Sequence, residues 1–111
     1  MEEPEERIAR TESLFRDVNE RIAESARRTD GEEVAFVCEC GEMDCTEKVQ
    51  APLGVYEHVR SDGTQFLLLP GHEDERVERV VEERARYSIV RKVNRIVAAY
   101  ARRLNPRAGT A

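Results

Sequence analysis

The stretch FVCECGEMDCTEKV, residues 36–49, contains all three cysteines of a 111-residue chain, at Cys38, Cys40 and Cys45. The segments EVAFV and EKVQA, which lead into and out of the cysteines, each predict a short β-strand. Between the two strands, Gly41 can take the positive φ that a tight loop requires. We therefore expect a strand–knuckle–strand unit that brings three sulfur atoms to one point.

Three thiols in one short segment favour a metal site over core packing, although cysteine is also a common core residue. Zinc in a structural site takes four tetrahedral ligands, with sulfur at about 2.3 Å, so one position is left for another side chain. His72 follows a Pro-Gly pair after the predicted strand TQFLLLP, and we expect it to be the fourth ligand. His58, on the predicted surface helix YEHVR, and Asp44 are the alternatives. Iron or an iron–sulfur cluster is the alternative to zinc.

The acidic residues around the cysteines are expected to face solvent. This rim consists of Glu39, Glu42, Asp44 and Glu47. Its negative charge raises thiol pKa values unless a cation offsets it, which favours a bound metal over a reactive thiolate. Glu73, or a backbone carbonyl, is expected to accept a hydrogen bond from the ring of His72 and so fix its tautomer.

The segments around the knuckle predict an α+β fold within a single domain, residues 1–111. Apolar residues recur every three or four positions near the N-terminus, which predicts an amphipathic helix over residues 5–29 that ends at Gly31. A small antiparallel sheet and a short middle helix, starting near Pro52, are expected to complete a core over residues 34–92. The apolar face of the first helix is expected to contain Ile8, Leu14 or Phe15, Val18, Ile22 and Ala26.

The C-terminal third of the chain fits two structures. Its apolar residues have the spacing of one long helix, but VERVV and YSIVRKV are rich in β-branched residues, which favours strands. We predict a hairpin over residues 77–92 and then a basic helix over residues 94–104, with the continuous helix as the alternative. The last segment, NPRAGTA at residues 105–111, predicts a loose tail.

Charge is divided unevenly along the chain. All 23 acidic residues lie within residues 1–83, whereas residues 84–111 carry eight basic side chains and no acidic one. One interpretation is that the two parts neutralise each other in the fold or across a homo-oligomer. The other is a nucleic-acid-binding surface. Its basic residues are Arg84, Arg86, Arg91, Lys92, Arg95, Arg102 and Arg103.

The sequence predicts neither a membrane span nor an export signal. No apolar run approaches the roughly 20 residues that cross a bilayer, and the N-terminus, MEEPEERIAR, is acidic where a signal peptide is basic and then apolar. An odd number of thiols without an export signal favours reduced cysteines in the cytoplasm over a disulfide framework.

Several of these segments together resemble a group of small bacterial proteins of uncharacterised function. The shared elements are an FRxxNERI helix, FVCEC with a third cysteine, EY-x-x-VR, PGHE and VERVVE, and they cover roughly residues 14–92. The resemblance implies that Cys38, Cys40, Cys45 and His72 are shared positions, and it implies no activity. The C-x-C spacing is also similar to SWIM-type zinc fingers. Their motif ends in C-x-H, however, whereas 26 residues separate Cys45 from His72 here.

Three functions are compatible with the sequence. The first is a structural zinc site in a non-enzymatic interaction or adaptor module that binds a protein partner. The second is a nucleic-acid-binding regulator that uses the basic C-terminal segment. The third is a thiol or metal redox sensor, or a metalloenzyme with Glu39 or Glu73 as general base. We favour the first, because four protein ligands leave no position for a reacting water.

Overall fold

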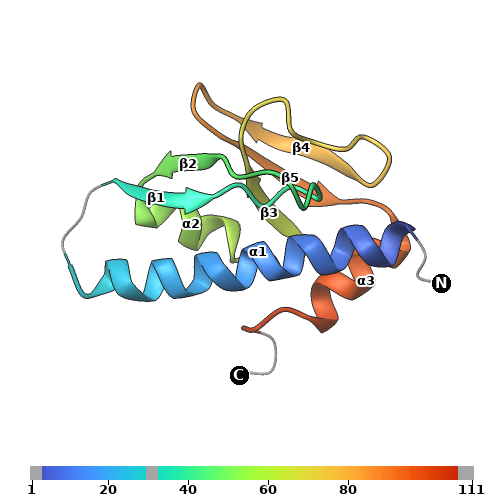
Figure 1. Cartoon of the computed structure of the whole chain (residues 1–111), viewed down its shortest axis with the longest axis horizontal. Helices are drawn as coiled ribbons and strands as arrows, with labels where there is room; N and C mark the ends of the chain where they lie inside the picture. Colours follow the sequence, from blue (N-terminus) through green and yellow to red (C-terminus); the bar gives the residue numbers. More distant parts are fainter. Residues whose placement is uncertain (1–3, 30–32, 108–111) are drawn as a thin grey trace.

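The computed structural model describes residues 4–29 and 33–107, and it has an α+β fold (Figure 1). Its elements are, in order, α1 (Pro4–Arg27), β1 (Val34–Val37), β2 (Lys48–Ala51), α2 (Leu53–Val59), β3 (Gln65–Leu68), β4 (Glu78–Glu83), β5 (Ser88–Lys92) and α3 (Arg95–Arg103). β1 and β2 pair in one antiparallel sheet, and β3, β5 and β4 form a second antiparallel sheet in that order. α1 runs the length of the molecule and packs against β1, α2 and α3.

The strands on either side of the cysteines confirm the prediction for this region. β1 and β2 each bury alternate residues, and Phe36 of β1 stacks on Tyr56 of α2 with the ring centroids 4.6 Å apart. β3 is buried at all four positions, as its continuous apolar run predicts. The predicted end of the first helix at Gly31 lies outside the described residues, and α1 ends at Arg27.

β4 and β5 form the predicted hairpin and α3 follows them, so the alternative of one long helix is wrong. The N–H of Arg84 donates to the carbonyl of Tyr87 at 2.9 Å and closes the turn between the strands. The side chain of Asn94 then accepts hydrogen bonds from the N–H groups of Ile96 and Val97. This N-cap starts a new helix directly after β5.

The buried face of α1 differs from the predicted apolar face. Leu14 and Val18, expected in the core, are 51% and 38% exposed. Partial burial is found for Ile8, Phe15, Ile22 and Ala26. The buried residues of the helix are instead Ala9, Thr11, Glu12, Ser13, Arg16, Asn19 and Ala23. The physical reason is that the polar residues have partners inside the fold. Arg16, for example, donates to the carbonyls of Gly63 and Ala101, each at 2.9 Å.

A second buried polar cluster joins α1 to the three-stranded sheet. Lys92 of β5 forms ion pairs with Glu12 of α1 and with Glu78 of β4, and all three side chains are at most 1% exposed. Burial raises the pKa of Glu12 to about 8, against the opposing effect of the Lys92 ammonium. Glu12 therefore favours its protonated form more than an exposed glutamate does, although the Lys92 ammonium opposes this.

The uneven charge of the chain is largely neutralised within the fold. Five of the eight basic residues beyond position 83 form ion pairs with carboxylates. Apart from Lys92 these pairs are Arg84–Glu82, Arg86–Glu33, Arg91–Asp62, Arg107–Glu20 and Arg107–Glu57. The two contacts of Arg107, at 2.8 Å each, hold the chain against α1 and α2. The prediction of a loose tail is thus wrong for residues 105–107, and residues 108–111 lie outside the described part.

Candidate metal centre

The β1–β2 pair positions the first cysteine at the base of the knuckle. The N–H of Cys38, directly after β1, donates to the carbonyl of Glu47 at 3.2 Å and extends the pairing of the two strands. The N–H of Cys45 donates to the carbonyl of Glu42 at 3.0 Å, which closes a turn within the loop. The knuckle is therefore fixed by backbone hydrogen bonds at its base and beside its last cysteine.

Gly41 serves the knuckle in a different way from the one predicted. Positive φ was expected there, but among the described residues only Gly71 has it, at 87°. A Cβ atom on Gly41 would lie 3.0 Å from Cγ2 of Ile8, closer than ordinary van der Waals contact. A side chain at position 41 would therefore press on Ile8, because the loop packs closely against α1.

His72 is presented by a tight turn at the end of β3. Gly71 takes its positive φ in this turn, and the N–H of His72 donates to the carbonyl of Leu69 at 3.1 Å. The N–H of Leu69 in turn donates to Sγ of Cys38 at 3.3 Å. The same few residues therefore place the imidazole beside the knuckle and bind one of its sulfur atoms.

Cys38, Cys40, Cys45 and His72 lie together, with one ligand atom of each within 4.8 Å of all the others. Nδ1 of His72 is 3.6 Å from Sγ of Cys38 and 3.8 Å from Sγ of Cys45. Around a tetrahedral zinc, bond lengths of about 2.3 Å to sulfur and about 2.0–2.1 Å to nitrogen give a sulfur–nitrogen separation of about 3.6 Å. The two sulfur–nitrogen separations are compatible with a metal ion bound by this group.

The thiols share protons and receive backbone hydrogen bonds. The pKa of Cys38 is raised and that of Cys40 is lowered, mainly because the Cys38 thiol donates to the Cys40 sulfur. Burial raises the pKa of Cys45. Hydrogen bonds from the backbone N–H groups of Glu42 and Glu47 lower the pKa of Cys40 and Cys45, respectively. A divalent cation takes the place of such shared protons when thiolates bind it.

The alternative ligands lie outside this group. His58 is exposed on α2, and its Nε2 contacts Glu82 at 3.0 Å. Asp44 is exposed and is not among the clustered ligand atoms. The expected hydrogen bond from His72 to Glu73 is not found among the described residues, and Oε1 of Glu73 has no hydrogen-bond partner. For Nδ1 of His72 to bind a metal ion beside these sulfur atoms, the proton of the neutral imidazole must lie on Nε2.

Glu39 is not part of the solvent-facing rim, although Glu42, Asp44 and Glu47 are exposed as predicted. Its side chain is fully buried, and its carboxylate accepts three hydrogen bonds. The donors are Asn19 Nδ2 at 2.8 Å, the Tyr56 hydroxyl at 2.9 Å and the Leu67 N–H at 2.9 Å. Burial raises the pKa of Glu39, while these hydrogen bonds oppose the rise. The residue between the first two cysteines thus connects α1, α2 and β3.

Asn19 continues this network into β1. Its side-chain amide accepts from the N–H of Val37 and donates to the carbonyl of the same residue, each at 2.8 Å, as a neighbouring strand would. The sequence contained one signal for these contacts. Glu12, Arg16, Asn19 and Ala23 are three or four positions apart, and this spacing places them on one face of a helix. Apolar periodicity alone does not detect a face of this kind.

Comparison of the chain with protein-family models, with curated proteins and with solved structures found no match. Within residues 4–29 and 33–107, no helix is both long enough and apolar enough to span a membrane.

Proposed function

We propose that the protein is a small zinc-binding protein with a structural Cys3His site, and that it acts as an interaction module. The observation that carries this proposal is the agreement between the sulfur–nitrogen separations of 3.6 and 3.8 Å and the edge of a zinc tetrahedron. The proposed ligands are Cys38, Cys40, Cys45 and His72.

Zinc bound here links two distant parts of the chain. The 26 residues between Cys45 and His72 include β2, α2 and β3. Closing a loop of this length opposes binding by about 3 kcal/mol, which is small beside the roughly 10–16 kcal/mol available to structural zinc in small domains. The metal therefore acts as a clasp that holds the β1–β2 knuckle against the end of the second sheet.

The surroundings of the site support a structural role over a catalytic one. Cys38 and Cys40 are each 1% exposed, and four protein ligands complete a tetrahedron without a water molecule. Glu39, considered as a general base, is fully buried and holds three donors of the protein itself. Its hydrogen bonds support the core and leave it no free access to a substrate.

The charge pattern favours a protein partner over nucleic acid. Affinity for nucleic acid comes largely from cations that replace counterions along the phosphate backbone. Most basic residues of the C-terminal segment already pair with carboxylates of this chain, and Lys92 is buried among them. Large apolar side chains remain exposed on α1, on the knuckle and on α3, as is common at protein interfaces.

The test is metal analysis of the purified protein together with its visible spectrum. We expect a colourless protein with one zinc per chain, and a strong chelator should lower its melting temperature sharply. Cys40→Ser is expected to lose the metal and to fold poorly. A brown protein that contains iron would contradict the assignment of zinc and show that the site binds iron instead. A melting curve that is unchanged after verified removal of zinc would refute the structural role.

A further inference from the structure

The outer face of α3 carries cations that the fold does not neutralise. Arg95, Arg102 and Arg103 form no ion pair within the described part of the chain. The guanidinium of Arg103 lies 4.3 Å from the centre of the Tyr100 ring, and the neighbouring Ile96 is 48% exposed. Cations and apolar atoms therefore share one side of this helix.

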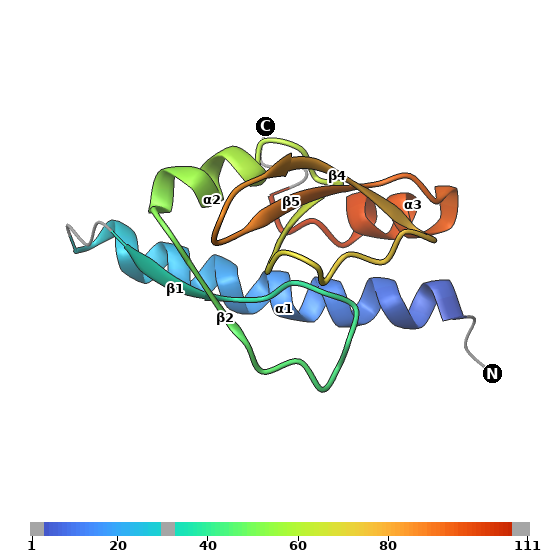
Figure 2. The ribbon, with the colours of Figure 1, turned by 90° about the horizontal axis from the view of Figure 1, so that it is seen from above.

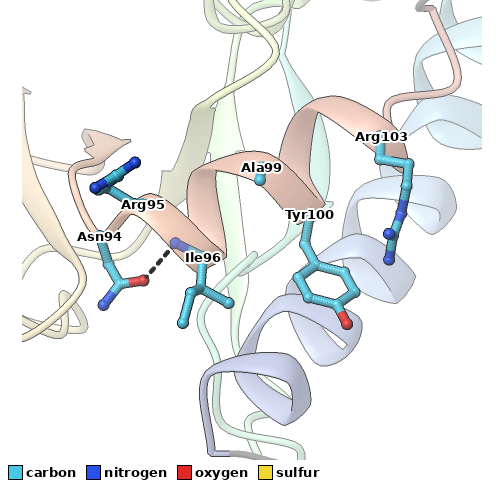
Figure 3. A pocket seen from close by; sticks show the side chains of 6 residues that line it. All are labelled: Asn94, Arg95, Ile96, Ala99, Tyr100 and Arg103. Carbon is cyan, nitrogen blue, oxygen red and sulfur yellow. Dashed lines mark hydrogen bonds between the residues drawn. The ribbon is translucent and has the colours of Figure 1, made fainter.

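These side chains line a hollow of about 730 Å³, seen from close by in Figure 3. We call its residues the α3 face, namely Asn94, Arg95, Ile96, Ala99, Tyr100 and Arg103. The hollow is bordered by Arg95 at one end and Arg103 at the other, with Ile96 and Tyr100 between them (Figure 3). A surface of this kind fits a partner that has one flexible apolar side chain flanked by carboxylates.

The tip of the knuckle has that composition. It consists of Glu42, Met43 and Asp44, and Met43 is 63% exposed. Neither carboxylate forms an ion pair with another described residue. Arg76, which lies beside the tip, is bound to Asp74 at 2.7 Å and also attracts Glu42 at longer range. An exposed methionine is well suited to an irregular hollow, because its unbranched side chain adapts to the shape available.

The knuckle tip and the α3 face lie on opposite sides of α1 in both views of the molecule (Figures 1 and 2). The tip of one chain therefore does not meet its own α3 face. We propose that the protein self-associates head to tail, with the knuckle tip of one copy seated on the α3 face of a second copy. Met43 enters the hollow beside Ile96, and Glu42 and Asp44 face Arg95 and Arg103.

An interface of this type has two consequences. Each association leaves one tip and one α3 face free, so that a third copy can add and the assembly grows beyond a dimer unless it closes into a ring. A three-residue tip against one helix is also a small contact, and its charges are exposed. The association is therefore weak and becomes weaker as the salt concentration rises.

The experiment is sedimentation velocity of the full chain at concentrations up to about 1 mM, at low and at high salt. We expect species larger than a dimer at low salt and a shift toward monomer at high salt. Met43→Asp and Ile96→Asp should each raise the dissociation constant at least about tenfold. An equimolar mixture of the two variants should give a 1:1 dimer and nothing larger, because only one intact tip and one intact α3 face remain.

Leu14→Asp is the matched control, since Leu14 is 51% exposed on α1 and lines neither the hollow of the α3 face nor the pocket beside the knuckle tip. It should leave self-association unchanged. A wild-type protein that is monomeric throughout at low salt overturns the proposal, including the case in which it binds an oligonucleotide. Loss of association in Leu14→Asp but not in Met43→Asp also overturns it and assigns the interface to α1.

The outcome is separable from that of the proposed zinc site. Neither Met43 nor Ile96 belongs to the ligand group, so the metal content of both variants should equal that of the wild type. Self-association of a protein that contains no zinc would refute the structural zinc site and support the head-to-tail contact. A zinc-loaded protein that stays monomeric would support the structural zinc site and refute the head-to-tail contact.

Discussion

Glu39→Ala is expected to lower the free energy of unfolding by about 3–5 kcal/mol, because it removes the carboxylate that accepts hydrogen bonds from three buried donors. These donors are Asn19 Nδ2, the Tyr56 hydroxyl and the Leu67 N–H, all within 2.9 Å of the carboxylate. Each buried donor left unsatisfied costs about 1–3 kcal/mol. The loss is expected in the lower part of the summed range, because removing Glu39 also removes the cost of burying its charge.

Two matched variants separate the contributions within this network. Glu39→Gln keeps the shape of the side chain but offers an acceptor on one side only, so we expect an intermediate loss of about 1–3 kcal/mol. Tyr56→Phe removes one donor and leaves the carboxylate with two, at an expected cost of about 1 kcal/mol. The expected order of destabilisation is therefore Glu39→Ala, then Glu39→Gln, then Tyr56→Phe.

The assay is urea unfolding followed by circular dichroism, with zinc in excess and the metal content measured for each variant. The metal measurement is needed because Glu39 lies between two of the proposed ligands, Cys38 and Cys40. A fully zinc-loaded Glu39→Ala protein within about 1 kcal/mol of the wild type would show that the three hydrogen bonds do not stabilise the fold.

Three further predictions concern separate parts of the molecule. His72→Ala should lose zinc affinity and stability together, whereas His58→Ala, on the surface, should change neither, and the reverse order in a metal titration would show that the wrong histidine is assigned. Because burial raises the pKa of Glu12 from 4.5 to about 8, the stability that its protonated form contributes should be lost as the pH rises from about 4.5 to about 8. Glu12→Gln should therefore be more stable than the wild type at pH values above about 8, and an equal pH dependence of the two in denaturant melts would contradict this. Gly41→Ala should be destabilised in the same melts because its Cβ meets Ile8, while the control Gly54→Ala, with nothing within 4 Å, should not.

The elements around the knuckle could be predicted because their signals are local. β-branched residues favoured a hairpin over a long helix in residues 77–92, and the pairing of β4 with β5 confirms it. A Pro-Gly pair predicted a turn at the end of β3, and this turn places His72 beside the cysteines. In each case a short segment contains the conformational preference that decides its structure.

The orientation of α1 could not be predicted in this way, because its partners lie far along the chain. Apolar spacing assigned Val18, and either Leu14 or Phe15, to the apolar face, yet it is Arg16 that is fully buried. The carbonyls that bind Arg16 belong to Gly63 and Ala101, 47 and 85 positions away. The apolar periodicity of a helix shows which of its side chains are apolar. It does not show whether a distant hydrogen-bond acceptor offsets the cost of burying a polar side chain.

These polar contacts also explain why α1 has one defined rotation. Glu12, Arg16 and Asn19 follow one another on a single face, and each binds a different part of the fold: Lys92 of β5, the carbonyls of Gly63 and Ala101, and Val37 of β1. Burial of apolar surface is non-directional and tolerates a turn of the helix about its axis, whereas hydrogen bonds do not. A rotation that buried Leu14 would break all of these contacts and leave their groups unpaired in the core. The exposed leucine is therefore a consequence of the polar face, and the interior of this small domain is specified by hydrogen bonds as much as by apolar packing.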